Sequence, residues 1–314
     1  MLLGRGDEVV CVVRKPNLCL DGLPVTLSTA PLGDADALAR AAEGCDGVFH
    51  VAGTFDPGPG GEALMRSLHV DGTQAVLRAA TLAGVPKVLV CSSSITCGYG
   101  PREAPGDEET PLDPGKVYGR SGALRAYHDT KLESEALART WGAVVVNPDY
   151  VLGAWDVKPT SGQLLLSIAK GRMFVYPRGG KTFVDAVDCA WGHVFALERG
   201  QPGRRYLLAN ESLSYREFMG RCATIAGVRP PILPVPDLAL GLLGRVGGVL
   251  QARDPHRFAG LEPHLLGAMR EGRYRSGRRA QTELGVPTTP IEGSIQSALQ
   301  WFREHGYLDG GRRG

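Results

Sequence analysis

The fold is decided by Gly47-Val48-Phe49-His50-Val51-Ala52 and Lys87-Val88-Leu89-Val90-Cys91, two apolar runs with a helical pattern over residues 61–83 between them. Each run is short and almost continuously apolar, which is typical of a strand covered on both faces. A helical connection of this length joins strands that lie parallel. The segment therefore predicts a strand–helix–strand unit within a parallel sheet.

The same alternation extends in both directions along the chain. Further strand patterns cover residues 8–14 and 143–147, and further helical patterns cover residues 34–43 and 124–141. The strand at residues 8–14 is predicted to be buried on both faces. We therefore predict an α/β fold with a doubly wound parallel sheet, whose ligand crevice lies at the carboxyl ends of the strands.

The character of the sequence changes after Pro148, where glycine, proline and aromatic residues become common. Helical patterns such as residues 215–226 and 291–305 are joined there by proline-rich segments. We predict one domain over residues 1–158 and a smaller, mainly helical substrate lobe over residues 159–308, some of whose elements return to the core. Residues 309–314 are expected to be a tail.

Composition excludes several classes of function. The 314 residues are 43% hydrophobic and 22% charged, with a net charge of +2, so nothing favours a nucleic-acid partner. The seven cysteines contain no C-x-x-C pair, which predicts reduced thiols and no metal site. Arg5 and Asp7 interrupt any signal peptide, and the apolar residues 238–250 are too short to span a bilayer. We therefore expect a cytoplasmic protein without a membrane partner.

Two residues carry a chemical signal. Tyr127 and Lys131 stand four residues apart, so a helix places them on one face. A neighbouring cation favours the ionised phenol, which suits Tyr127 for proton transfer. Ser92-Ser93-Ser94 follows a predicted strand directly, where a hydroxyl would reach the ligand crevice.

The sequence resembles the extended short-chain dehydrogenases/reductases, and among them the dihydroflavonol-reductase-like branch with the hopanoid-associated sugar epimerases. The resemblance includes Val70-Asp71-Gly72-Thr73 and the Tyr127–Lys131 motif, and it runs to about Leu308. The matching segments are residues 46–53, 70–73, 87–96, 127–131, 147–148, 151–153, 156–160, 183–188, 301–303 and 306–308. Residues 1–158 would then be a Rossmann-like dinucleotide-binding domain.

The resemblance implies a role for each candidate residue. Tyr127 would be the general acid/base, Lys131 would tune it and bind the nicotinamide ribose, and Ser93 would be the catalytic serine, with Ser94 as the alternative. The residues expected to bind the cofactor are Arg14, Lys15, Val51, Ala52, Gly53, Cys91, Lys131, Pro148 and Val151. Arg14 follows a strand end where an arginine suits the phosphate of NADP, so we expect NADP and leave NAD open.

The front of the expected pattern is missing. No Gly-rich turn precedes the strand at residues 8–14, so the predicted sheet is N-terminally incomplete and cofactor binding is in question. Three explanations stay open: a misassigned start or shortened chain, loss of nicotinamide chemistry, or replacement of the strand by another segment or subunit. Pro31 replaces an acid expected to meet the adenine, and His69 replaces an asparagine. His69 is interpreted as a polar helix residue, with a proton relay as the alternative.

We therefore predict an NAD(P)-dependent oxidoreductase or epimerase that acts on the carbonyl/carbinol pair of a small or sugar-like substrate by a Tyr-Lys-Ser mechanism. The alternatives are a cofactor-free enzyme of this fold, catalysing elimination or cyclisation, and a binding module that keeps the crevice. The expected partner is a small-molecule substrate, and a homodimer stays open.

Overall fold

A computed structural model describes residues 1–15, 18–236, 239, 242, 246, 247, 253, 254, 267 and 269–308. Its central sheet has four parallel strands in the order β3-β4-β5-β9. They are β3 (Gly47–His50), β4 (Lys87–Cys91), β5 (Val144–Pro148) and β9 (Arg205–Leu208). The carboxyl ends of these strands share one edge of the sheet, which is where the predicted crevice should open.

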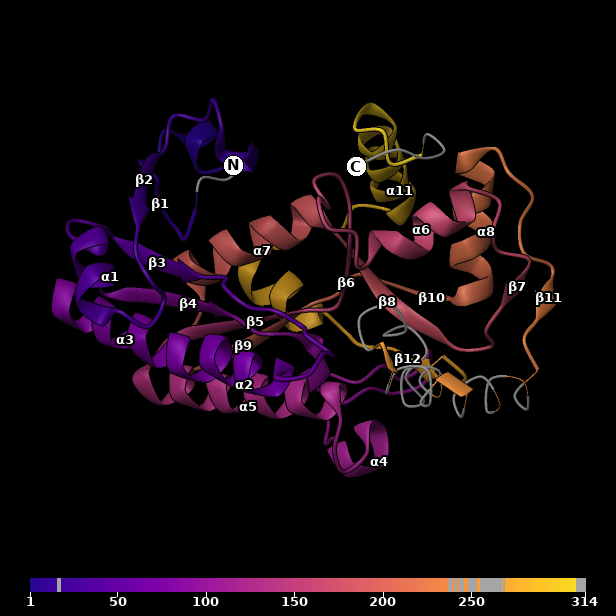
Figure 1. Cartoon of the computed structure of the whole chain (residues 1–314), viewed down its shortest axis with the longest axis horizontal. Helices are drawn as coiled ribbons and strands as arrows, with labels where there is room; N and C mark the ends of the chain where they lie inside the picture. Colours follow the sequence, from indigo (N-terminus) through magenta and orange to yellow (C-terminus); the bar gives the residue numbers. More distant parts are fainter. Residues whose placement is uncertain are drawn as a thin grey trace.

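Helices cover both faces of this sheet (Figure 1). On one face lie α1 (Ala35–Ala42), α3 (Gly72–Ala83) and α5 (Ala123–Trp141), and on the other lies α7 (Ala186–Arg199). Because successive side chains of a strand point to opposite faces, Val88 and Val90 of β4 pack in the first layer and Leu89 packs in the second. The structure thus confirms the predicted doubly wound α/β fold.

The first two strands stand apart from the central sheet. β1 (Val10–Val13) and β2 (Thr26–Thr29) form a two-stranded parallel sheet of their own. The prediction that this strand is buried on both faces is wrong, since Val10 and Val12 are 37% and 44% exposed. The physical reason is the small size of the sheet: β1 pairs with β2 alone among the described strands, and α1 covers one side of it.

The helical pattern between β3 and β4 is divided into three parts. α2 (Gly61–Arg66) passes through a π-helical turn, η3 (Ser67–Asp71), into α3. Such a turn inserts an extra residue into the helix and often occurs at functional sites. Here it holds His69 in the interior, with 1% of its surface exposed.

A second body of structure is formed by segments after β5, and the chain returns from it to the central sheet at β9. Its sheet has the order β10-β8-β12, and β6 also pairs with β8. The strands are β6 (Tyr150–Leu152), β8 (Gly180–Asp185), β10 (Glu211–Ser214) and β12 (Gly272–Arg273), and a separate pair is β7 (Val175–Tyr176) with β11 (Leu233–Pro234). The sequence patterns did not anticipate these short strands.

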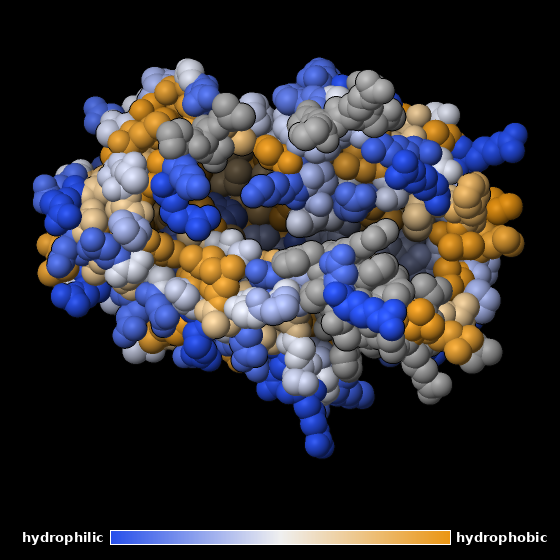
Figure 2. All heavy atoms as spheres, viewed as in Figure 1, coloured by the Kyte–Doolittle hydropathy of each residue, from blue (hydrophilic) through white to orange (hydrophobic). Residues whose placement is uncertain are grey.

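Helices α6 (Gly162–Ala169), α8 (Tyr215–Ala226) and α11 (Ile291–Glu304) enclose the core of this second body. Phe183 of β8 stacks on Phe218 of α8 with ring centroids 4.1 Å apart. The short helices elsewhere are η1 (Leu3–Arg5), η2 (Leu18–Leu20), η4 (Ser94–Thr96), α4 (Pro114–Tyr118) and η6 (Ala280–Leu284). On the face shown in Figure 2, hydrophilic residues are interspersed with small groups of apolar ones.

Candidate active site

Helix α5 supplies the candidate acid/base residues. Tyr127, Lys131 and Glu135 follow one another at four-residue spacing and therefore line one face of the helix. Lys131 and Glu135 are buried, and Tyr127 is half-buried. This face points at the chain segment that leaves β4, so the side chains meet the residues that follow Cys91.

Ser93 lies within hydrogen-bonding reach of the Tyr127 phenol. Burial raises the pKa of Tyr127 above its ordinary value, and the hydrogen bond with Ser93 opposes that rise. The expectation that a neighbouring cation would lower this pKa is therefore wrong for the described geometry. Desolvation of the phenolate outweighs the other influences on it.

Lys131 is directed at the end of strand β4. Its Nζ donates a hydrogen bond to the carbonyl oxygen of Cys91 over 3.0 Å. Burial lowers the pKa of Lys131, while the nearby Cys91 and Glu135 act in the opposite direction. Gly53 lies against the same amino group, because a Cβ at this position would stand 3.1 Å from Nζ. A side chain here would crowd Lys131, which explains why the position is a glycine.

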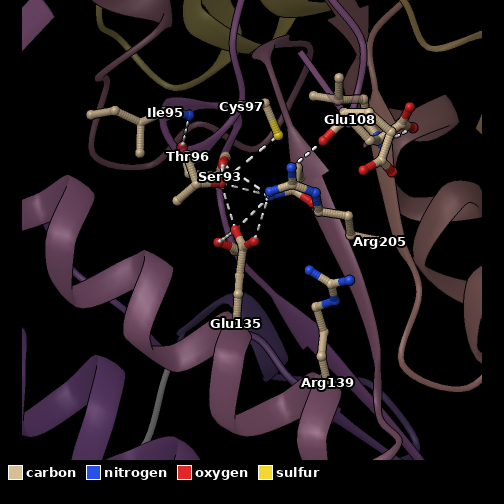
Figure 3. A network of polar contacts seen from close by, with 12 residues as sticks. Ser93, Ile95, Thr96, Cys97, Glu108, Glu135, Arg139 and Arg205 are labelled. Carbon is tan, nitrogen blue, oxygen red and sulfur yellow. Dashed lines mark hydrogen bonds and ion pairs between the residues drawn. The ribbon is translucent and has the colours of Figure 1, made fainter. Parts of the chain in front are cut away.

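Glu135 organises the segment that carries the serines (Figure 3). Its Oε1 accepts hydrogen bonds from Ser92 Oγ at 2.5 Å, Thr96 Oγ1 at 2.6 Å and Asn147 Nδ2 at 2.7 Å. Its Oε2 pairs with Arg205 Nη1 at 3.3 Å. A buried carboxylate needs such partners to compensate for its lost hydration. The cluster ties α5 to β5, β9 and the turn after β4.

The backbone of Ser93 is fixed by the same cluster. Its carbonyl oxygen accepts from Asn147 Nδ2 at 3.1 Å and lies 3.0 Å from Thr96 Oγ1. Ser94 is engaged elsewhere, because its Oγ donates to Asp149 Oδ1 at 2.9 Å and Asp149 also faces Arg275. Of the two serines considered from the sequence, Ser93 is the one in contact with Tyr127.

The residues expected to bind a cofactor fall into two groups. Gly53, Cys91 and Lys131 come together at the carboxyl ends of β3 and β4, and Val51, exposed by 62%, and Ala52 precede Gly53 in the chain. Pro148 ends β5, and Val151 in β6 packs against the core beside α7. In contrast, Arg14 and Lys15 are exposed in the separate β1–β2 region, and the described contacts do not join them to this group.

Sequence reasoning missed several groups of this site, namely Thr96, Thr130, Glu135, Asp149 and Arg205. The sequence pattern could have identified Glu135, because it stands four residues after Lys131, just as Lys131 stands four residues after Tyr127. The others come from segments distant in the chain and show no pattern of their own. The described residues contain no cluster of three or more His, Cys, Asp or Glu side chains placed to hold a metal ion.

No helix within the described ranges is long and apolar enough to cross a membrane.

Comparison with known proteins identifies the family of this chain. The NAD dependent epimerase/dehydratase family matches residues 1–209, about two thirds of the sequence, and the chain belongs to this family. It is 31% identical to a putative dihydroflavonol 4-reductase of Synechocystis, over 98% of this chain and 91% of that protein. It is 28% identical to sterol demethylase protein B of Methylococcus capsulatus, over 98% of this chain and 94% of the other.

Among solved structures, the crystal structure of gox2253 is similar with a TM-score of 0.81 and 30% identity, covering 98% of this chain and 94% of that one. The resemblance to extended short-chain dehydrogenases/reductases stated from the motifs is thereby confirmed. Membership of this family supports a general role as an oxidoreductase or epimerase.

Proposed function

We propose that this chain is an NAD(P)-dependent oxidoreductase or epimerase that interconverts a carbonyl and a carbinol on a small substrate through Tyr127, Lys131 and Ser93. The observation that supports the proposal is that Ser93 lies beside the Tyr127 phenol, while Lys131 bonds the carbonyl oxygen of Cys91 at the end of β4. All three groups lie at or just beyond the carboxyl end of β4. A substrate oxygen placed there meets a proton donor and a second hydroxyl at once.

In the reducing direction, Tyr127 Oη gives its proton to the substrate oxygen as negative charge develops there. The hydroxyl of Ser93 donates a hydrogen bond to the same oxygen and holds it in place. Lys131, which is buried, bonds the carbonyl oxygen of Cys91 and so holds the strand end that leads to Ser93. In the oxidising direction this proton moves from the substrate hydroxyl to Tyr127, which then acts as the base.

The residues at the edge of the sheet fit the nicotinamide end of a dinucleotide. The backbone of residues 51–53 is open and lacks a bulky side chain beside Lys131, whose remaining donors can reach ribose hydroxyl groups. A bound nicotinamide supplies or accepts the hydride that the protein itself cannot. Arg14 and Lys15 favour NADP over NAD as the cofactor, since both are cations exposed after β1.

The two relatives point to the substrate class. One is named as a putative dihydroflavonol 4-reductase and the other as a sterol demethylase protein. We infer a small, fairly apolar carbonyl compound or the corresponding alcohol, with a sugar-like substrate as the alternative. The second body of structure, from about Thr160 onward, would determine which of these substrates binds.

Two measurements test the proposal on the whole chain. The first is titration with NADPH, followed by energy transfer from tryptophan, which should show saturable binding. The second is NADPH oxidation with a panel of aldehydes and ketones, in which Tyr127→Phe should lose about 10²-fold or more of the rate. Tyr307→Phe is the matched control. Tyr307 follows α11, and its hydroxyl donates a hydrogen bond to the carbonyl oxygen of Val157.

Absence of NADPH binding at millimolar concentration would contradict the redox proposal. Turnover that needs no nicotinamide, yet disappears in Tyr127→Phe, would instead support the acid/base alternative. Binding of a small molecule without turnover would support the binding module.

A further inference from the structure

His69 makes three contacts that all involve the candidate site. It lies in the π-helical turn η3 and is buried. Its Nε2 is 3.2 Å from the backbone nitrogen of Thr54, and its Nδ1 is 2.9 Å from Thr130 Oγ1. Its ring also packs edge-on against Tyr127, with centroids 5.5 Å apart. One side chain thus connects η3, the segment after β3, and the helix that carries Tyr127 and Lys131.

The hydrogen bonds determine which ring nitrogen holds the proton. The hydroxyl of Thr130 donates its single proton to the carbonyl oxygen of Ala126, at 2.8 Å. Its oxygen must therefore accept from His69, which places a proton on Nδ1. At the other nitrogen, the amide of Thr54 can only donate, so Nε2 must offer its lone pair. Both hydrogen bonds form when the ring is neutral with its proton on Nδ1. They cannot both form in the charged ring, which carries a proton on each nitrogen.

The electrostatic surroundings favour the same neutral state. Burial lowers the pKa of His69 to about 4, and the positive charge of Lys131 contributes in the same direction. His50 of β3 also lowers the pKa of His69. Near neutral pH the ring therefore has no proton to exchange at Nε2, the nitrogen that accepts from Thr54.

Gly53 shows what the ring holds in place. A Cβ at this residue would lie 3.1 Å from Lys131 Nζ and 3.4 Å from His69 Nε2, so the backbone here lies close to both groups. The next residue, Thr54, is the one bonded to the ring. The position of His69 therefore sets how closely this backbone approaches Lys131.

We propose that His69 is a positioning residue, permanently neutral with its proton on Nδ1, which holds Gly53 and Thr54 against Lys131 and Tyr127 and relays no proton. Its meaning for catalysis rests on the proposed function, whereas the tautomer and its structural role do not. This assignment replaces both interpretations drawn from the sequence, a simple polar helix residue and a proton relay.

The direct test is nitrogen-15 NMR of the full chain labelled at histidine, with the signals of residue 69 identified by their loss in His69→Gln. We expect a protonated Nδ1 and an unprotonated Nε2 that stay unchanged from pH 8 to pH 5. A protonated Nε2, or a titration centred near 6.5, would overturn the proposal. This measurement needs neither cofactor nor substrate, so it stands if the redox proposal fails.

A kinetic test separates positioning from proton relay. His69→Gln keeps a donor and an acceptor, and His69→Leu keeps neither. Misplaced backbone beside Lys131 should lower kcat/KM for an active aldehyde by roughly tenfold or more in His69→Leu, with a smaller loss in His69→Gln and the pH profile unchanged in both. The matched control, exposed His305→Gln, should behave as the wild type. Loss of one limb of the pH profile in both His69 variants would show a relay and contradict positioning.

Discussion

Lys131 Nζ and the carbonyl oxygen of Cys91 are joined by a hydrogen bond of 3.0 Å, which anchors the middle of α5 to the last residue of β4. The bond uses one of the three donors of the ammonium group and leaves two for other partners. It also places Lys131 close enough to influence the Cys91 thiol. The pKa of the cysteine at this strand end is consequently shifted in the opposite direction from those of the buried cysteines.

Cys91 should be more reactive than the buried thiols of Cys97 and Cys222. Burial raises its pKa, but the hydrogen bond and charge of His193, together with Lys131, outweigh this effect and leave the pKa below its ordinary value. Burial raises the pKa of Cys97 to about 12 and that of Cys222 even further. At pH 7, iodoacetamide should therefore label Cys91 before either, as measured by peptide mass spectrometry. His193→Gln should slow the labelling of Cys91, and equal rates in the two proteins would contradict this account.

Ser93 and Ser94 should differ in their effect on Tyr127. Because the hydrogen bond of Ser93 lowers the pKa of Tyr127, Ser93→Ala should raise that pKa further. Ser94→Ala removes a bond to Asp149 and should leave the phenol unchanged. Carbon-13 NMR of the tyrosine Cζ signals, assigned with Tyr127→Phe, measures both. Ser93→Ala should also lower turnover by about 10²-fold. A larger shift from Ser94→Ala would reverse the assignment of the serine.

Glu135 should matter far more to stability than its neighbour on the same helix. Glu135→Gln removes the charge from a buried ion pair and should lower the free energy of unfolding by about 3 kcal/mol or more. Glu133→Gln is the matched control, since its pair with Arg66 lies in solvent, where screening leaves it little net effect on stability. Urea denaturation measures the two differences. Similar small losses would mean that the buried cluster does not stabilise the turn after β4.

His50 should make the protein less stable in acid. Its Nε2 bonds Thr73 Oγ1 in the interior, and burial with the charge of Lys131 lowers its pKa to about 4. A histidine with a folded-state pKa below its unfolded value binds more protons when unfolded. Its contribution is complete above about pH 6.5 and falls by about 1.4 kcal/mol per pH unit down to about pH 4.

Chemical denaturation at pH 7 and pH 5 tests this dependence. The loss of unfolding free energy between the two values should be smaller in His50→Gln than in the wild type. The control is His305→Gln, at an exposed histidine. It should lose as much unfolding free energy between pH 7 and pH 5 as the wild type does. An unchanged loss in His50→Gln would show that His50 is not held neutral in the folded protein.

Much of the fold was predictable because periodicity is a local property of the chain. The strand pattern at residues 87–91 coincides with β4, and the helical pattern at residues 124–141 differs from α5 by one residue at its start. Both rest on many apolar positions in regular order. Most strands outside the central sheet escaped prediction because β6, β7, β11 and β12 have only two or three residues each, too few for a pattern of alternation.

The sequence alone determined the family, the parallel sheet, and the pair Tyr127 and Lys131, because residues four apart on a helix must share a face. Only the tertiary structure decided between Ser93 and Ser94 as the partner of Tyr127, since different residues far along the chain bind each serine. It alone also showed that burial governs the pKa of Tyr127 and that His69 joins Thr54 to Thr130. Burial and long-range hydrogen bonds arise from packing, which spacing along one chain does not encode.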